Sequence, residues 1–209
     1  MNWMDMNLKD FQSALASSSP TPGGGTASAI ALGQAASLAV MVCDLTLGSE
    51  RWKDGWEIAE RIQMVAIPLL HQSGVLANED SDAFDEVMAC FKLPKSDEAE
   101  IQSRRTAIRK ATLKAATVPY ETACLATDLL VLLPELAEKG NANAVSDVGV
   151  AGLLASAASK GAVFNVEINL ESLPEDMGVD VRSGLNDLKE RTKTASRAFM
   201  EAVRNRMSS

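Results

Sequence analysis

Residues 19–42 read SPTPGGGTASAIALGQAASLAVMV, and this stretch decides how the rest of the chain can fold. Its first part, residues 19–26, holds two prolines, which fix φ and donate no backbone hydrogen bond. Three glycines follow, and they allow another group to approach the backbone closely. Its second part, residues 27–42, is a run of small apolar residues. We expect a stiff loop leading into a buried, closely packed helix over residues 26–47, with Thr26 as its N-cap.

A Pro/Gly cluster of this kind has two explanations, which the loop alone does not separate. The first is an ordinary turn between two helices. The second is the wall of a ligand site, in which bare backbone contacts the ligand at the start of a helix. The candidate binding residues of the second explanation are Pro22, Gly23, Gly24 and Gly25.

The composition favours helices over strands. The chain has 209 residues, of which 46% are hydrophobic but only 4% aromatic, so its core is built mainly from Ala, Leu, Val and Met. These residues suit helices better than the β-branched and aromatic residues of strands do. No stretch shows sustained period-two alternation. We therefore predict an all-α fold, a single-domain helical bundle over residues 1–209 with long helices, partly kinked at proline.

Helical periodicity divides the remaining sequence into segments separated by Pro and Gly. Pro68, Pro119 and Pro134 are expected to bend or break the helices that contain them. Asn143 is the expected N-cap of a helix that runs to about residue 160, where Gly161 interrupts it. The other expected helices cover residues 5–17, 55–91, 96–138 and 180–207.

Charge and cysteine content limit the classes of partner. The formal net charge is −8, which disfavours nonspecific binding to nucleic acid. The three cysteines have no metal-like spacing, and we interpret them as reduced residues of a reducing compartment. The N-terminus lacks the pattern of a signal peptide. Residues 27–42 fall short of the roughly 20 residues of a membrane span. A cytoplasmic protein without membrane or nucleic-acid partners is expected.

Asp80 is the carboxylate that is hardest to explain as a solvent-exposed surface residue. Asp80 lies in register with a stripe of apolar residues that repeat at helical spacing, so we expect it to face the core. An ionised group there must be paired, have a raised pKa or line a ligand cavity. The structural alternative is a buried ion pair with Arg104 or Arg105. The apolar residues that share this face are Leu76, Phe84, Val87 and Phe91.

Other polar residues gather where helices are expected to begin and end. Residues 140–147 read GNANAVSD, which holds more polar side chains than capping requires. Asp44 stands near a helix C-terminus, where the dipole opposes a carboxylate. Asn165 and Asn169 are four residues apart, so they share a helix face. The basic cluster around Arg105 is a candidate anchor for an acidic ligand tail.

Seven segments in order resemble the cyclodeaminase/cyclohydrolase family, over about residues 7–205. The resemblance implies an all-helical homodimer that binds a tetrahydrofolate substrate near the subunit interface. We expect no cofactor and no metal. The segments are SPTPGGGT (19–26), MVCDLTLG (41–48), DSDAFD (80–85), LPK (93–95), VP (118–119), GNANAVSD (140–147) and NVEIN (165–169).

The resemblance is stronger to the cyclohydrolase branch, which implies hydrolysis of 5,10-methenyltetrahydrofolate to 10-formyltetrahydrofolate. On this hypothesis Asp80 is the base, and Asp147 is a second catalytic residue that holds the pterin ring. The alternatives are the cyclodeaminase reaction, which releases ammonia, and a non-catalytic folate-binding helical protein. The remaining candidate substrate-binding residues are Asp44, Asn141, Asn143, Asn165 and Arg105, together with the glycine-rich loop.

Overall fold

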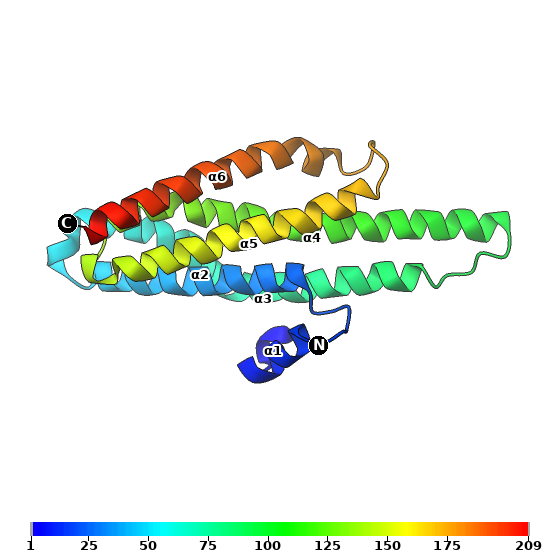
Figure 1. Ribbon diagram of the computed structural model, residues 1–209, viewed down its shortest axis with the longest axis horizontal. Helices are drawn as coiled ribbons and strands as arrows, with labels where there is room; N and C mark the ends of the chain where they lie inside the picture. Colours follow the sequence, from blue (N-terminus) through cyan, green and yellow to red (C-terminus); the bar gives the residue numbers. More distant parts are fainter. Residues whose placement is uncertain (1, 209) are drawn as a thin grey trace.

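The computed structural model describes residues 2–208, and it is helical throughout, with no strand in this range. The predicted all-α fold is therefore confirmed. Six α-helices and three 3-10 turns follow one another along this described range (Figure 1). Their bounds are η1 Trp3–Asp5, α1 Leu8–Leu15, α2 Gly24–Leu47, η2 Glu50–Gly55, α3 Trp56–Cys90, α4 Glu98–Lys139, η3 Ala142–Ala144, α5 Val145–Glu171 and α6 Val179–Met207.

Helices α2 to α6 form an elongated bundle, and the short α1 lies beside it (Figure 1). Helix α2 packs against α3 and α5, while α4 packs against α3, α5 and α6. The C-terminal part of α3 and the N-terminal part of α4 extend beyond the other helices as a two-helix projection. Residues on this projection have fewer neighbours than residues in the bundle, so apolar side chains there stay exposed, as Phe84 and Phe91 do.

The bundle core depends on small residues that let helices approach closely. Four alanines of α2 are completely inaccessible to solvent, namely Ala29, Ala35, Ala36 and Ala39. In α5, a Cβ atom on Gly152 would come within 2.5 Å of the ring of Phe199 from α6. Gly161 plays the same part against α2, since its Cβ would come within 2.6 Å of Ser28 Oγ. The predicted close-packed helices are present.

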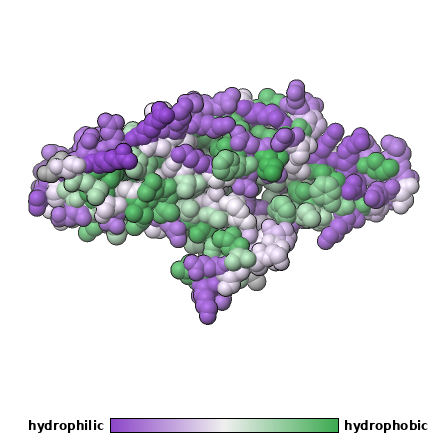
Figure 2. Space-filling model, in the orientation of Figure 1, coloured by the Kyte–Doolittle hydropathy of each residue, from purple (hydrophilic) through white to green (hydrophobic). Residues whose placement is uncertain are grey.

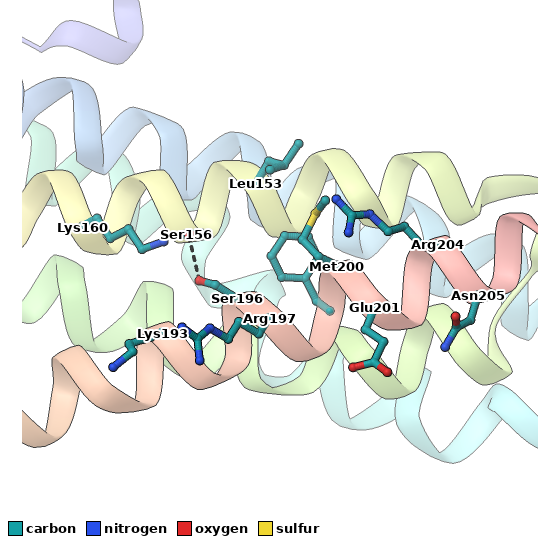
Figure 3. Close-up of a pocket in the computed structure, with 11 residues that line it drawn as sticks. Leu153, Ser156, Lys160, Lys193, Ser196, Arg197, Met200, Glu201, Arg204 and Asn205 are labelled. Atoms are coloured by element: carbon teal, nitrogen blue, oxygen red, sulfur yellow. Dashed lines mark hydrogen bonds between the residues drawn. The ribbon is translucent and has the colours of Figure 1, made fainter.

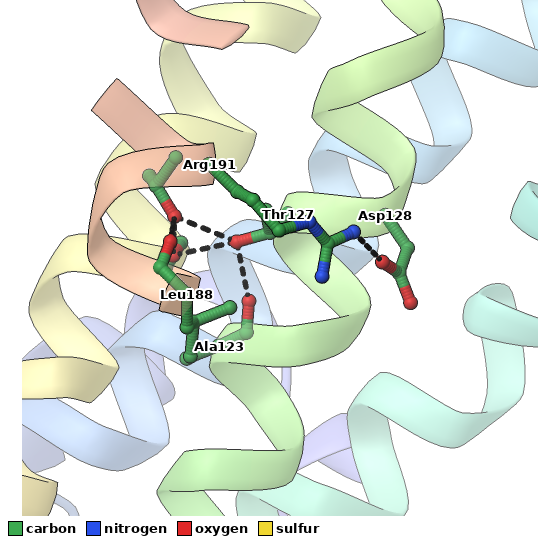
Figure 4. A network of polar contacts seen from close by, with 7 residues as sticks. Ala123, Thr127, Asp128, Leu188 and Arg191 are labelled. Carbon is green, nitrogen blue, oxygen red and sulfur yellow. Dashed lines mark hydrogen bonds and ion pairs between the residues drawn. The ribbon is translucent and has the colours of Figure 1, made fainter. Parts of the chain in front are cut away.

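Three buried hydroxyls join α4, α5 and α6 at one level of the bundle (Figure 4). Thr127 Oγ1 lies 3.0 Å from Ser159 Oγ and 2.8 Å from Thr192 Oγ1, and the last two lie 3.0 Å apart. All three side chains are at most 2% exposed. Because each hydroxyl has its partners on two other helices, the set fixes how these helices align along their axes.

Several expected helix boundaries are wrong. Helix α5 continues to Glu171 through Gly161, because that glycine serves packing against α2 rather than termination. The bounds of α3 and α4 agree with the expected helices 55–91 and 96–138, and both helices run through their three internal prolines, so the expected alternative of a break at these prolines is wrong. Thr26 is not an N-cap, since α2 begins at Gly24. Asn143 does not cap α5; it lies in η3, where its backbone N–H donates to the Asn141 side chain at 3.0 Å.

Within residues 2–208, three segments are long and apolar enough to cross a membrane by length and composition alone: α2, α4 and residues 142–171. The expectation that the apolar run is too short was wrong for α2. The helix has 24 residues because the glycines before the run and the residues up to Leu47 are helical as well. In the bundle, these helices pack against one another, and the absence of a membrane partner stays a prediction.

Candidate active site

The first turn of α2 is capped by a side chain from α3. The N-cap residue of α2 is Gly23, which has no side chain to accept hydrogen bonds from the free N–H groups of the turn. Asp80 takes this role, since it accepts from Thr26 Oγ1 at 3.1 Å and from the Thr26 backbone N–H. Its Oδ1 lies against Gly25, in the space that a Cβ atom there would need. The glycine at position 25 is therefore required for the carboxylate to approach.

Two opposing effects set the pKa of Asp80. Burial raises it, because the charged form loses water. The two hydrogen bonds from Thr26 lower it, but the net direction is upward. The alternative ion pair does not form among the described residues: Arg104 donates instead to the Phe91 carbonyl at 3.1 Å, and Arg105 is exposed. Asp80 is thus a partly buried carboxylate held by hydrogen bonds, and a raised pKa of this kind makes it a candidate general base.

Asp80 lines a cavity of about 160 Å³ at the end of the bundle where α2 begins. The cavity lies between the Pro/Gly loop and side chains from α3, α4 and α5. Its size is about half that of a small ligand pocket, so one side of a ligand would extend beyond it. The lining residues are Pro20, Thr21, Gly23, Gly24, Gly25, Asp80, Phe84, Ala115, Asn165 and Asn169.

Two carboxamides from α5 form the polar wall of this cavity. Asn165 Nδ2 donates to the Gly161 carbonyl at 3.0 Å, and Asn169 Nδ2 donates to the Ala115 carbonyl at 2.9 Å. Their N–H groups therefore hold backbone, while the side-chain oxygens accept no hydrogen bond from the described part of the chain. Oxygens of this kind suit the N–H donors of a heterocycle. Asn165 was a predicted site residue, and Asn169 was recognisable from its i+4 spacing.

The other polar residues named from the sequence lie at the opposite end of α2. The Asn141 backbone N–H donates to Thr46 Oγ1 at 3.0 Å, and its side chain donates to the Leu45 carbonyl at 3.2 Å. Asp44 accepts from Gln63 at 2.6 Å. Helix α2 is about 36 Å long, so these residues cannot share a pocket with Asp80 in one chain. The prediction that these residues share one pocket with Asp80 is therefore wrong for a single chain. The reason is that the chain turns from α4 into α5 at the C-terminal end of α2, far from Asp80. Asn143 in η3 and Asp147 in the first turn of α5 lie at this same end.

Two further site predictions are not met by the cavity of one chain. Pro22 is a buried residue of the Pro/Gly loop and does not line the cavity. Arg105 is exposed on the two-helix projection and does not line it either, because the first turns of α4 extend past the bundle. Phe84 and Thr21 line the cavity and were not among the predicted site residues. The signal for Phe84 was present, since it follows Asp80 by four residues on the same face.

A larger groove lies between α5 and α6, with a volume of about 750 Å³ (Figure 3). Its floor includes Phe199 and Met200, and Ser156 and Ser196 contact each other across it at 2.8 Å. It holds none of the predicted site residues and no buried carboxylate. We therefore assign the candidate site to the smaller cavity, where a helix N-terminus, a carboxylate with a raised pKa and two carboxamides converge.

The surface of α2 and α5 carries exposed apolar side chains over an uncharged helix. Helix α2 has no charged residue before Asp44. The exposed side chains of this α2–α5 face are Met41, Leu45, Val150, Phe164 and Ile168. Figure 2 shows apolar residues gathered over these two helices. An exposed face of this kind is typical of a surface that binds another protein chain.

Comparison with known proteins places this arrangement in a family. The sequence profile of the formiminotransferase-cyclodeaminase family matches residues 7–182, and the chain belongs to this family. It is 37% identical over 172 residues to the methenyltetrahydrofolate cyclohydrolase of Methylorubrum extorquens, covering 80% of this chain and 81% of the relative.

A longer relative and a solved structure support the same family assignment. The formimidoyltransferase-cyclodeaminase of Rattus norvegicus is 29% identical over 208 residues, which cover 97% of this chain but 38% of that protein. The crystal structure of formiminotetrahydrofolate cyclodeaminase from Thermotoga maritima superposes with a TM-score of 0.84 at 28% identity, covering 97% of this chain and 98% of the other. The whole bundle thus superposes on nearly the whole of that solved chain.

Proposed function

We propose that this chain is a methenyltetrahydrofolate cyclohydrolase that converts 5,10-methenyltetrahydrofolate to 10-formyltetrahydrofolate. The observation that carries the proposal is the Asp80 carboxylate, whose pKa is raised by burial and which lines a cavity beside two carboxamide oxygens. The 37% identity to a protein named for this activity, over four fifths of both chains, supports the choice of reaction.

In the proposed reaction Asp80 acts as a general base. The methenyl carbon is an electrophilic amidinium carbon, so it reacts with water once a proton is removed. Asp80 takes that proton as the water oxygen bonds to the carbon, which gives a neutral hydroxyl adduct. The adduct then collapses to the formyl group: its bond to N5 breaks, Asp80 returns its proton to N5, and the hydroxyl proton leaves to solvent. One water is consumed and one proton is released.

Within this proposal, Asn165 and Asn169 accept hydrogen bonds from the pterin ring, and the glycine-rich loop covers one of its faces. The cyclodeaminase reaction is the second candidate. It is favoured by the TM-score of 0.84 to a protein named for that activity. There, a ring nitrogen displaces ammonia, and a protonated Asp80 would serve as the donor.

We further infer that the working form is a homodimer that buries the α2–α5 face. The cavity is small and open, and the predicted binding residues are divided between the two ends of α2. A two-fold axis across the middle of this face would set Asp80 of one copy beside the partner's Asn141 and the partner's Asp147. Such an arrangement would complete each site with residues from both chains.

The reaction is tested with purified protein by the loss of methenyltetrahydrofolate absorbance and, separately, by ammonia release from formiminotetrahydrofolate. Turnover in the first assay alone supports the cyclohydrolase, and turnover in the second alone supports the cyclodeaminase. Folate binding without either activity contradicts both. Asp80→Asn should abolish turnover while the protein stays folded.

The shared site is tested by mixing two inactive variants, Asp80→Asn and Asp147→Asn, after dissociation and reassociation. Half of the dimers are then mixed and each carries one intact site, so about a quarter of the wild-type activity should return. No recovery from mixed dimers contradicts a shared site. Light scattering without detergent should give a dimer, whereas a protein soluble only with lipid or detergent would indicate a membrane against this face.

A further inference from the structure

The segment before α1 docks against α3 close to the candidate site. The Trp3 backbone N–H donates to Asn78 Oδ1 at 2.9 Å, and the side chain of Met4 lies over Gly74. The Trp3 ring packs edge-on against Phe11, with centroids 6.4 Å apart. Trp3 lies outside residues 7–182, which match the family profile.

A continuous series of hydrogen bonds runs from Trp3 to Asp80. Trp3 Nε1 lies 2.9 Å from Ser81 Oγ, which lies 2.9 Å from Thr26 Oγ1, which lies 3.1 Å from Asp80 Oδ2. Ser81 and Thr26 are buried, at 4% and 0% exposure. Water therefore has little access to the two hydroxyls between the indole and the carboxylate.

The two ends of the series fix the direction of every hydrogen bond in it. An indole N–H can only donate and an ionised carboxylate can only accept. Thr26 has one hydroxyl proton, which goes to Asp80, so Ser81 must supply the proton between the two hydroxyls. Ser81 in turn accepts from Trp3. A protonated Asp80 that donated to Thr26 would reverse this order and leave two donors facing Ser81.

We propose that Trp3 is a positioning residue for Asp80, acting through Ser81 and Thr26. Its N–H orders the two hydroxyls so that both donate toward the carboxylate. The ordered series holds Oδ2, favours the ionised form and leaves Oδ1 beside Gly25 to act on the reacting water. The last step rests on the proposed function, whereas the hydrogen-bond coupling does not.

The coupling is tested by the ¹⁵N–¹H signals of the indole groups during a pH titration. The chain has three tryptophans, and Trp3→Phe identifies the Trp3 signal by its loss. That signal should shift with pH, with the midpoint at which Asp80 titrates in a carboxyl ¹³C experiment. In Asp80→Asn and in Thr26→Val the shift should disappear. A Trp3 signal that does not respond to Asp80 overturns the proposal, whether or not the protein is active on folates.

The effect of Asp80 on the Trp3 signal must be distinguished from the effects of neighbouring ionisable groups that also titrate. Asp5 and Asp10 lie in the N-terminal segment, Glu79 and Asp82 on α3, and α4 contributes Lys114, which pairs with Glu86 at 3.1 Å. Helix α2 contributes no charge near this end. Asp5→Asn and Asp82→Asn should therefore leave the titration of the Trp3 signal in place. Loss of the shift in these variants, with retention in Asp80→Asn, contradicts the assignment.

The catalytic part is tested by Trp3→Phe, which keeps the ring against Phe11 but removes the N–H. We expect kcat to fall on the order of tenfold with KM little changed, and the acid limb of the kcat/KM profile to move to higher pH. Ser81→Thr keeps the hydroxyl and should retain the wild-type profile, while Ser81→Ala should behave like Trp3→Phe. Phe11→Leu is the matched packing control. A wild-type pH profile in Trp3→Phe contradicts a positioning role.

Discussion

The carboxylate of Asp80 occupies the space beside Gly25 that any larger residue there would fill. Helices α2 and α3 therefore meet through a charged side chain placed against bare backbone. The same contact caps a helix and lines the cavity, which joins the stability of the fold to the candidate chemistry at one place.

Gly25→Ala should displace the Asp80 carboxylate, because the new Cβ atom would overlap it. We expect a loss of about 1–3 kcal/mol in the free energy of unfolding. Gly24→Ala is the matched control for stability, since its nearest neighbour would be Asn165 Nδ2 at an ordinary 3.7 Å. Equal melting temperatures for the two variants, measured by calorimetry, would show that position 25 tolerates a side chain.

Asp80→Asn should change how stability depends on pH. Because burial raises the pKa of Asp80, the folded state binds the proton more tightly than the unfolded chain does. The contribution of this carboxyl to stability is therefore fully present at low pH and is lost as pH rises through the folded pKa.

The neutral amide of Asp80→Asn can still accept the hydrogen bond from the Thr26 backbone. The variant should thus gain stability relative to wild type as pH rises toward 7, as urea titrations at several pH values would reveal. Asp82→Asn, on the exposed side of the same helix, should show no such trend relative to wild type. A constant difference between wild type and Asp80→Asn across pH would refute the linkage.

Thr127→Val should destabilise the bundle by about 1–3 kcal/mol, because it leaves Ser159 and Thr192 with fewer partners in a dry interior. Thr117→Val is the control, since that hydroxyl is exposed and bonds only to its own helix at the Leu113 carbonyl. Replacing all three buried hydroxyls by apolar groups should be less destabilising than the sum of the single changes. Additive losses in chemical denaturation would contradict a cooperative set.

Cys43 should be inert to thiol reagents in the folded protein. Burial, and then the negative charge of Asp44, raise the pKa of its thiol to about 12, so the reactive thiolate is scarce. Cys90 is partly exposed and should be labelled much faster. Mass spectrometry of labelled peptides before and after unfolding checks this, and labelling of both cysteines at equal rates in the native state would be incompatible with it.

The sequence predicted most of the fold because its signals are local. The small apolar run of residues 27–42 marks α2 as a buried helix, and the spacing of Leu76 and Asp80 assigns a carboxylate to the inner face of α3. The helix ends were harder to predict. Three glycines in a row argue against helix by propensity, yet α2 begins at Gly24 because Asp80, 56 positions later, caps it.

The candidate site was predicted only in part, for the same reason. Asn165 and Asp80 could each be selected as polar residues on inward faces. Their distance from Asn141 could not be predicted, because it depends on where α4 turns into α5 relative to the length of α2. The role of Thr26 as donor to Asp80 and the contact of Trp3 with Ser81 join residues more than 50 positions apart, for which no local pattern exists.

If the homodimer proposed above forms over the uncharged length of α2, protein concentration becomes a variable of function. If two copies cover this helix together, mass action governs how many complete sites exist. Specific activity should then fall on dilution, and the melting temperature should rise with concentration. A cell could thus set the activity of this chain through its abundance alone, with no effector and no modification.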